Sequence, residues 1–583
     1  MEEKTLFARK ATGLVREIGF STAIILAVCN AVGLGWQKRV FQAIGAESVY
    51  PQEYVLGIHP MVMAFLLIGI LMLVSIYAFA VLSSAMPRSG GGYVFMSRII
   101  NPGFAFVATC LEFLSVAISY GLIAVATFEA TLIFGSLAGV DTSGLANPYF
   151  MSIFGIVIIA FFSGIACMGT RMTGYVLHVM FWIPAGILAI VYLVFIVANP
   201  AAMEAGVGAI APGHMAAEYT QAAIDQGLTS GVYWSAVFAA SFYAYWAYIG
   251  YAAATFVAGE VKEASRSLPK IIFISGIVIM GIYMSISFLL ARAGSMAGVV
   301  DVGGGKTWSL IDAVGFLGPG AGSFEDAGLP TIGAWMPYFA GISAYGVFGA
   351  GMGKVFGILM FVMGTMWVAN DIPPFILTCS RMLFAMGFDR ILPEWVADIN
   401  EKRAAPVNAI IVTSVAALIG VVAEAELFGD AGIAFLKPIL HSPFGQQFIS
   451  SSGAIVATDL WDALFFGGMG LACALFPSRL PEVFERAPWR QSKRLVVGMG
   501  WASFVTNALF SLLILVHSAG YGWGPIKITL GPLGSFGGNF LSLNFWFTIV
   551  LIVVSALVYY WGRSRAKRLG ADLTTIFAQI PPE

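Results

Sequence analysis

The stretch from Gly231 to Gly259, GVYWSAVFAASFYAYWAYIGYAAATFVAG, most constrains what this chain can fold into. It carries no charged side chain and exceeds the ~20 apolar residues with which a helix crosses a bilayer. Near its centre Gly250 stands between two tyrosines. A backbone interruption at such depth is tolerated where it lines a cavity or is buried in protein, whereas a glycine in an intact helix lets a neighbouring helix pack closely. The stretch predicts a membrane span with one of these two features at Gly250.

The composition extends this prediction to the whole chain. Of the 583 residues, 59% are hydrophobic and 10% are charged, against about 25% charged residues in soluble domains. The five cysteines fall in apolar segments without metal-ligand spacing and are expected to be small buried hydrophobes. No HExxH, GxSxG or paired-carboxylate arrangement stands out, so neither an enzyme nor a metal or cofactor site is expected. The net charge of −1 gives no indication of a nucleic-acid partner.

The first apolar segment predicts a second interruption. Gly33 and Gly35 lie two residues apart, just after the polar Asn30, and each glycine weakens a helix by about 1 kcal/mol relative to alanine. Interruptions at corresponding places in two halves of a transporter indicate a binding site at the membrane midplane. A half-helix N-terminus offers N–H groups to an anion, and a half-helix C-terminus offers carbonyls to a cation. Such a pair suits a zwitterion.

Three stretches resemble the amino acid–polyamine–organocation permeases: PRSGGGY at 87–93, AYIGYAAATFVAGEVKEASRSLPK at 247–270, and the segment from SRMLF to PVNAI at 380–410. The resemblance runs from the first interruption to the end of the chain, although Trp36–Arg39 departs from the family's usual continuation and Arg390 replaces its usual glycine. It implies an all-α polytopic membrane protein with about 12 transmembrane helices. These form an inverted five-helix repeat with broken helices one and six, plus two C-terminal helices.

Basic residues give the expected organisation, because Lys and Arg favour the cytoplasm. They gather in the N-terminal tail, in alternate loops and in the C-terminal tail, which places both termini in the cytoplasm of a multi-pass cell-membrane protein. The expected segments are a tail (1–17), a first repeat (18–198), an exterior loop (199–230), a second repeat (231–476) with exterior loops 291–336 and 424–459, helices eleven and twelve (477–562), and a second tail (563–583).

The resemblance also implies where a substrate binds. Its carboxylate is expected at the amides of the first interruption and its amine at carbonyls of the second, with Trp246 and Tyr248 against its side chain. The candidate substrate-binding residues are Val32, Gly33, Leu34, Gly35, Trp246, Ala247, Tyr248, Ile249 and Gly250. No catalytic residue is expected.

Ionisable residues inside spans are candidates for function. Asp371 is the candidate for coupling to a proton, although its context Asn370-Asp371-Ile372-Pro373-Pro374 could equally mark a helix kink. Some proton-driven relatives carry a lysine in the fifth span, and none is present here. Glu112 is expected to pair with a basic residue near the inner surface, and His178 to be a hydrogen-bonded interior histidine.

These observations predict a secondary active transporter that moves an amino acid by alternating access, with a proton or sodium ion as a possible coupling partner and no cofactor. Two alternatives stay open. The chain could carry a polyamine or another organic cation, or it could be a non-transporting permease-like sensor or complex subunit. The oligomeric state is not predicted.

Overall fold

The computed structural model describes residues 14–42, 51, 53–304, 306–428, 432–433, 438, 451–517, 525–529, 535–539 and 543–580. Within them the protein is almost entirely helical, as predicted. The α-helices are α1 (Phe20–Cys29), α3 (Pro60–Ala85), α4 (Gly92–Ile99), α5 (Pro102–Leu137), α6 (Pro148–Cys167), α7 (Thr170–Val197), α8 (Pro200–Ile210), α9 (Ala216–Asp225), α10 (Tyr233–Tyr248), α11 (Ala253–Phe256), α12 (Ala264–Gly294), α13 (Leu310–Leu317), α14 (Met336–Ala369), α15 (Ile372–Phe388), α16 (Val407–Glu424), α18 (Ser451–Arg479), α19 (Pro481–Arg486), α20 (Lys493–His517), α21 (Leu543–Arg568) and α22 (Leu573–Ala578).

Short elements complete the described structure. Two antiparallel hairpins pair β1 (Val300–Asp301) with β2 (Thr307–Trp308) and β3 (Pro525–Thr529) with β4 (Ser535–Asn539), with Val300 opposite Trp308 and Lys527 opposite Gly537. Tighter and wider helical turns occur as 3-10 helices at Val55–Gly57, Ser143–Leu145, Ile249–Ala252, Ala258–Glu260 and Glu394–Ala397, and as a π-helix at Gly35–Arg39.

Several helices begin at a capping motif that is visible in the sequence, an asparagine followed by a proline. Helices α5, α6 and α8 each start with a proline, and the asparagine before it accepts a hydrogen bond from a backbone N–H of the first turn. Proline suits the first helical position because its missing N–H would have no partner there, and an asparagine cap satisfies one of the free N–H groups that follow. The capping residues are Asn101, Asn147 and Asn199.

The membrane-spanning helices match the predicted set. Among the described residues, ten helical segments are long and apolar enough to cross a bilayer. The two other predicted spans are the interrupted ones, which contain α1 and α10. Helix α18 begins at Ser451, earlier than the predicted start of the tenth span at Leu460. Most of loop 424–459 lies outside the described residues, as do the tail residues 1–13 and 581–583.

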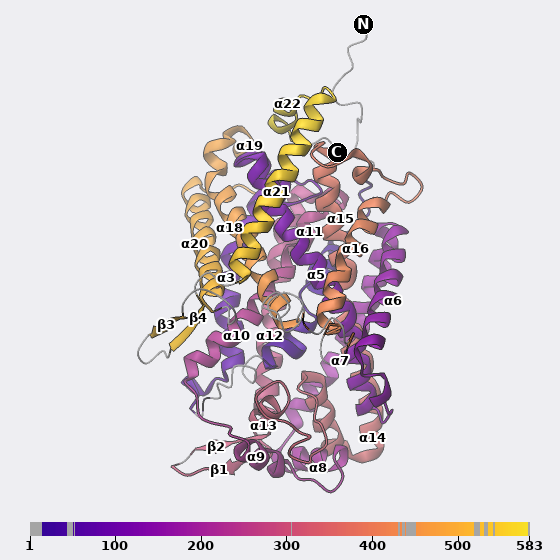
Figure 1. Cartoon of the computed structure of the whole chain (residues 1–583), viewed down its shortest axis with the longest axis vertical. Helices are drawn as coiled ribbons and strands as arrows, with labels where there is room; N and C mark the ends of the chain where they lie inside the picture. Colours follow the sequence, from indigo (N-terminus) through magenta and orange to yellow (C-terminus); the bar gives the residue numbers. More distant parts are fainter. Residues whose placement is uncertain are drawn as a thin grey trace.

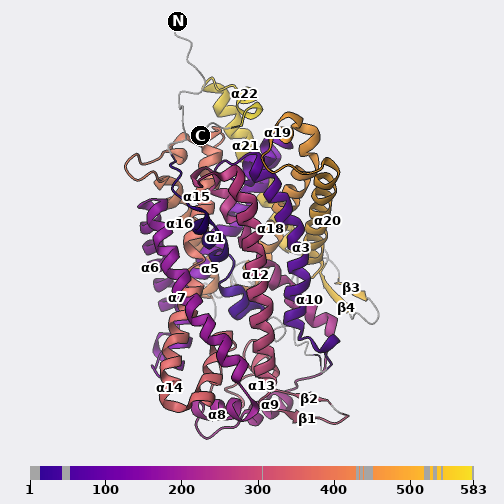
Figure 2. The same ribbon diagram turned by 180° about the vertical axis from the view of Figure 1, so that it is seen from behind.

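The segments at the two ends of the helical bundle differ (Figures 1 and 2). Helix α22 lies at one end, where Arg98 donates to the carbonyl of Gln579. Ile18 bridges Val261 at the same end. Helices α8, α9 and α13 and hairpin β1–β2 lie together at the opposite end. Loops 199–230 and 291–336 therefore share one end, and their exterior location stays a prediction.

Helix contacts come in exchanged pairs between the two halves of the bundle. Helix α1 packs on α12 and α10 packs on α3; α5 packs on α16 and α15 packs on α6; α1 packs on α7 and α10 packs on α18. Two repeats related by a twofold axis produce this pattern. Helices α20 and α21 pack outside these pairs, on α18 and α5 respectively. The repeat boundaries at 18–198 and 231–476 stay a prediction.

The sequence predicts a re-entrant or surface segment at 339–353, followed by a separate span. In the structure this segment and the beginning of that span both belong to helix α14. The residues from Met336 to Tyr345 are buried, against α5 and α8. The helix is broken at Gly349, whose φ of 75° and ψ of 171° are not helical. Glycine adopts such a positive φ without steric cost. The part after Gly349 and helix α15 together cover the predicted eighth span, residues 355–386.

Candidate functional site

The first span is interrupted where the sequence predicts it. Helix α1 ends at Cys29, residues 30–33 are not helical, and the chain resumes a helical path at Leu34, continuing as the π-helix. The interruption therefore begins two residues before the predicted Val32. Two of its amides are bonded internally, since the Val32 N–H donates to the Val28 carbonyl at 2.8 Å and the Gly33 N–H donates to the Ala31 carbonyl at 3.0 Å.

Asp371 lies with its carboxyl group beside the next residues of this interruption, Gly33 and Leu34. It lies between α14 and α15, where Pro373 and Pro374 lack the N–H groups that would continue the α14 hydrogen-bond ladder. The Leu34 N–H lies beside its carboxyl group. A Cβ atom on Gly33 would lie 1.9 Å from the Asp371 Oδ2 atom. The absence of a side chain at Gly33 is therefore what admits this buried carboxylate.

At the second interruption the backbone of the sixth span winds more tightly and does not leave the helical path. Helix α10 passes directly into the 3-10 turn Ile249–Ala252 and then into α11. A Cβ atom on Gly250 would lie 2.0 Å from the Asn30 carbonyl oxygen, so this glycine permits the two interrupted spans to touch. Both features considered for Gly250 are thus present together: an irregular turn and a close helix approach.

The carbonyls predicted to receive a substrate amine already accept protein hydrogen bonds. The Asn30 Nδ2 atom donates to the Gly250 carbonyl at 3.2 Å. The Tyr283 hydroxyl donates to the Ala247 carbonyl at 2.8 Å and also to the Ala31 carbonyl. Donors from α1 and α12 thus bind the two carbonyls at the second interruption.

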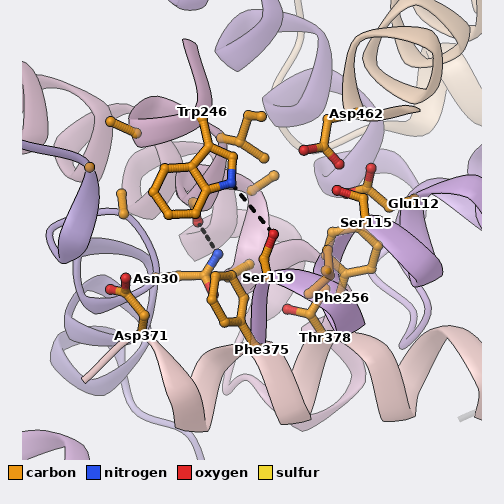
Figure 3. A pocket seen from close by; sticks show the side chains of 18 residues that line it. Asn30, Glu112, Ser115, Ser119, Trp246, Phe256, Asp371, Phe375, Thr378 and Asp462 are labelled. Carbon is orange, nitrogen blue, oxygen red and sulfur yellow. Dashed lines mark hydrogen bonds between the residues drawn. The ribbon is translucent and has the colours of Figure 1, made fainter. Parts of the chain in front are cut away.

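A pocket lies between the two interruptions (Figure 3). Asp371 stands at one end, Glu112 and Asp462 stand at the other, and Asn30 and the Trp246 indole lie between them. The indole Nε1 donates to the Ser119 hydroxyl at 3.4 Å. Three of the eighteen lining residues are acidic, and none of those eighteen is Lys, Arg or His.

Glu112 on α5 and Asp462 on α18 lie next to each other at one end of the pocket. Each residue is only 2% exposed, and the two carboxyl groups lie close enough to interact electrostatically. One oxygen of each, Oε2 of Glu112 and Oδ1 of Asp462, has no partner among the described residues. The prediction that Glu112 pairs with a basic residue near the inner surface is wrong, because the fold brings a second carboxyl group to it.

Buried ion pairs flank the pocket on both sides. Arg381 donates to Glu260 at 2.8 and 2.9 Å on the side of Ile18 and α22. On the other side, Arg39 donates to both oxygens of Glu424 at 2.5 and 2.7 Å, and Lys38 pairs with Glu129. These charges are compensated, which distinguishes them from the acidic groups of the pocket.

The structure brings together some of the predicted site residues. Gly35, Trp246, Ala247, Ile249, Gly250 and Asp371 line the pocket, whereas Val32, Gly33, Leu34 and Tyr248 are not among its lining residues. The Tyr248 hydroxyl donates instead to the Phe65 carbonyl at 3.0 Å on α3. Gly35 also meets α10, since a Cβ atom there would lie 2.5 Å from the Ala247 Cβ.

Sequence reasoning missed Asp462, Ser119, Phe375 and Thr378 as pocket residues. Asp462 carried a usable signal, because it is an ionisable residue within an apolar span. The other three are ordinary residues of their helices and become recognisable only when the helices are packed. His178 is hydrogen-bonded as predicted, with its Nε2 atom 3.0 Å from the Thr22 hydroxyl.

Comparison with known proteins gives the family. The amino acid permease family model matches residues 18–580, which is nearly the whole chain. No curated protein matches the chain. The fold of interrupted and continuous spans agrees with the family match, which identifies a transporter and not an enzyme. The chain therefore belongs to the amino acid permease family of the amino acid–polyamine–organocation superfamily and is a multi-pass membrane transport protein.

Proposed function

We propose that this protein is an alternating-access carrier whose substrate is a small organic molecule with a net positive charge carried by an ammonium group. The observation that carries the proposal is the pocket between the two interruptions, where three buried carboxyl groups face the cavity without a lining cation. Its position between two ion-paired clusters supports alternating access, because opening one cluster at a time would expose the pocket to one side only.

The chemistry of the pocket favours a cation. A buried carboxylate that lacks a partner is unfavourable, and hydrogen bonds to charged groups contribute about 1.5–3 kcal/mol. An ammonium group between Glu112 and Asp462 would satisfy the two oxygens that have no partner among the described residues. The face of Trp246 adds a cation–π surface, worth about 2 kcal/mol when desolvated.

A zwitterionic amino acid is the second candidate, favoured by the family match and by the interruption of the first span. In the predicted pose its carboxylate binds at residues 32–35 and its amine at the carbonyls near residues 247–250. Protein groups occupy several of these positions. An amino acid with a cationic side chain would still place that side chain at Glu112 and Asp462.

Orientation and coupling belong to the same proposal. The basic residues favour a cell-membrane protein with both termini in the cytoplasm and with loops 199–230 and 291–336 outside. Coupling to a proton or a sodium ion, with Asp371 as the candidate residue, stays a prediction. Imposing each gradient in turn on reconstituted vesicles tests it, because only the coupling ion drives accumulation.

Uptake into reconstituted vesicles tests the proposed function. The panel pairs cadaverine with lysine, putrescine with ornithine and tyramine with tyrosine, and adds the neutral amino acid leucine. We expect saturable uptake and counterflow of at least one ammonium compound with a cationic side group or tail, and no leucine uptake. Flux of leucine alone would overturn the proposal. Binding without flux of any compound would favour the sensor alternative.

Charge-neutral variants locate the site. Glu112→Gln and Asp462→Asn should each weaken binding of the transported compound about 10- to 100-fold, as expected for loss of a hydrogen bond to a charged group. Asp459→Asn is the matched control, since Asp459 is buried on the same helix but does not line the pocket. Equal losses in all three variants would contradict the assignment to this pair.

A further inference from the structure

We infer that Asp371 takes the place of a substrate carboxylate, so that the pocket selects amines over the amino acids that carry the same side chain. This inference rests on the proposed function and assigns its specificity to one residue. It starts from the contact between Asp371 and the first interruption, which joins two segments more than 300 positions apart in the sequence.

The first step is that Asp371 fills the space where a ligand carboxylate was predicted. The Leu34 N–H lies beside the Asp371 carboxyl group. Any Cβ on Gly33 would lie 1.9–2.4 Å from the three terminal atoms of its carboxyl group. A space that cannot hold one added carbon atom beside this group has no room for a second carboxylate.

The second step concerns the other amides of the interruption. The N–H groups of Val32 and Gly33 donate to carbonyls of their own segment, at 2.8 and 3.0 Å. An incoming carboxylate would have to break these bonds, and it would meet the Asp371 carboxyl group at contact distance. Like charges so close together repel, and a buried site strengthens the repulsion.

The third step is that the same end of the pocket presents acceptors. Oδ1 of Asp371 and Oδ1 of Asn30 have no hydrogen-bond partner among the described residues. Both residues line the pocket, and the Asn30 side chain is fixed by its hydrogen bond to the Gly250 carbonyl. Figure 3 shows the two side chains next to each other. Acceptors fixed in this way suit an ammonium group.

The fourth step joins the two ends. The acceptor at Asp371 and the acceptors at Glu112 and Asp462 lie on opposite sides of Trp246, and the Asn30 acceptor lies next to the indole. A diamine could place one ammonium group at each end and its alkyl chain along the indole. The corresponding diamino acid carries the same two ammonium groups plus a carboxylate, for which this pocket offers no free donor among the residues of the first interruption discussed above.

The experiment compares cadaverine with lysine on the full-length protein, by titration in detergent and by uptake in vesicles. Wild-type protein should bind cadaverine at least about tenfold more tightly than lysine. Asp371→Ala removes the internal carboxylate and exposes the Leu34 amide, so it should weaken cadaverine binding and strengthen lysine binding, inverting the preference. Asp371→Ser serves the same purpose if the alanine variant is unstable.

Asp371→Asn is the matched control. Its amide oxygen can still accept from Leu34 and fill the space beside Gly33, but its NH₂ group cannot accept from an ammonium group. Cadaverine binding should fall while lysine binding stays as weak as in the wild type. Gain of lysine binding in the alanine or serine variant but not in the asparagine variant is a result that a merely structural role would not produce.

Three results would overturn the inference, and they differ in what they imply for the proposed function. If wild-type protein prefers cadaverine but neither small variant gains lysine binding, Asp371 does not set the specificity and the proposed function stands. If wild-type protein binds lysine as tightly as cadaverine and Glu112→Gln abolishes both, the carrier accepts cationic amino acids. If no compound bearing an ammonium group binds, the proposed function fails as well.

Discussion

Helices α1 and α10 are both interrupted in mid-course, but the interruption takes a different form in each. After α1 four residues leave the helical path, and the Leu34 amide turns to a side chain from another segment, Asp371. After α10 the backbone only tightens to a 3-10 turn, and its carbonyls at Ala247 and Gly250 accept from neighbouring helices.

The difference shows that two similar sequence features, the glycines of the two interruptions, have separate structural roles. The glycine of the first interruption, Gly33, makes room for a side chain, whereas the glycine of the second, Gly250, makes room for the backbone of Asn30 and Ala31. A side chain can rotate or be replaced, but a backbone contact between two helices cannot yield without moving a helix. We therefore expect the first interruption to govern specificity and the second to hold the spans together.

The largest effect is expected from Gly250→Ala. The new Cβ would lie 2.0 Å from the Asn30 oxygen, 2.2 Å from its carbonyl carbon and 2.5 Å from the Ala31 nitrogen. Because these are backbone atoms, the loss of stability should reach or exceed the upper end of the ~1–3 kcal/mol usual for overpacking. Thermal unfolding of the purified protein in detergent measures it.

The matched control for this variant is Gly281→Ala in α12, where an added Cβ meets no atom within 4 Å. Since alanine is the better helix former by about 1 kcal/mol, this variant should melt at or slightly above the wild-type temperature. Comparable melting of Gly250→Ala and wild type would show that the two interrupted spans do not need their close approach.

A smaller and reversible effect is expected from Gly33→Ala. The added Cβ would overlap the Asp371 carboxyl group, a side chain that can be shortened. The single variant should lose about 1–3 kcal/mol of stability, and the double variant Gly33→Ala/Asp371→Ala should recover part of that loss. A double-mutant cycle on the melting data gives the coupling, about 0.5–3 kcal/mol for residues in contact.

Strictly additive losses in that cycle would mean that Gly33 and Asp371 are independent, which contradicts the account of the first interruption. At the second interruption no second substitution can recover the stability lost in Gly250→Ala, because no single side chain accounts for the contact at Gly250. The two outcomes together would separate a side-chain contact from a backbone contact.

Much of the fold could be predicted from the sequence, because spans and caps are local signals. Apolar length set the spans, the pair Gly33 and Gly35 indicated the first interruption, and the single Gly250 indicated the second. The site was less predictable for a physical reason. Asp371 was recognised as an ionisable residue within a span, but its contact with Gly33 depends on packing between α1 and α15. Glu112 was assigned a basic partner, since nothing local to α5 indicates that α18 brings Asp462 to it.

The smallest effect is expected from Tyr283→Phe, which removes one oxygen atom. The Tyr283 hydroxyl on α12 donates to the carbonyls of Ala31 and Ala247 and so connects the two interruptions. Without it each buried carbonyl loses an acceptor bond, and the net contribution of one hydrogen bond is about 0.5–1.5 kcal/mol. Because the hydroxyl has one hydrogen to share between the two carbonyls, we expect a loss of about 0.5–1.5 kcal/mol, seen as a lower melting temperature with unchanged expression.

The control is Tyr192→Phe on α7, whose hydroxyl lies 2.6 Å from the Ser285 hydroxyl at an exposed position on the same helix α12. That bond connects two continuous helices, so its loss should shift the melting temperature less. Tyr283→Phe should also loosen the coupling between the interruptions, making backbone hydrogen exchange faster at both residues 30–34 and 247–252. Faster exchange at the first interruption alone would mean that the 3-10 turn keeps its structure without this link, and that the two interruptions are held by the Gly250 contact rather than by Tyr283.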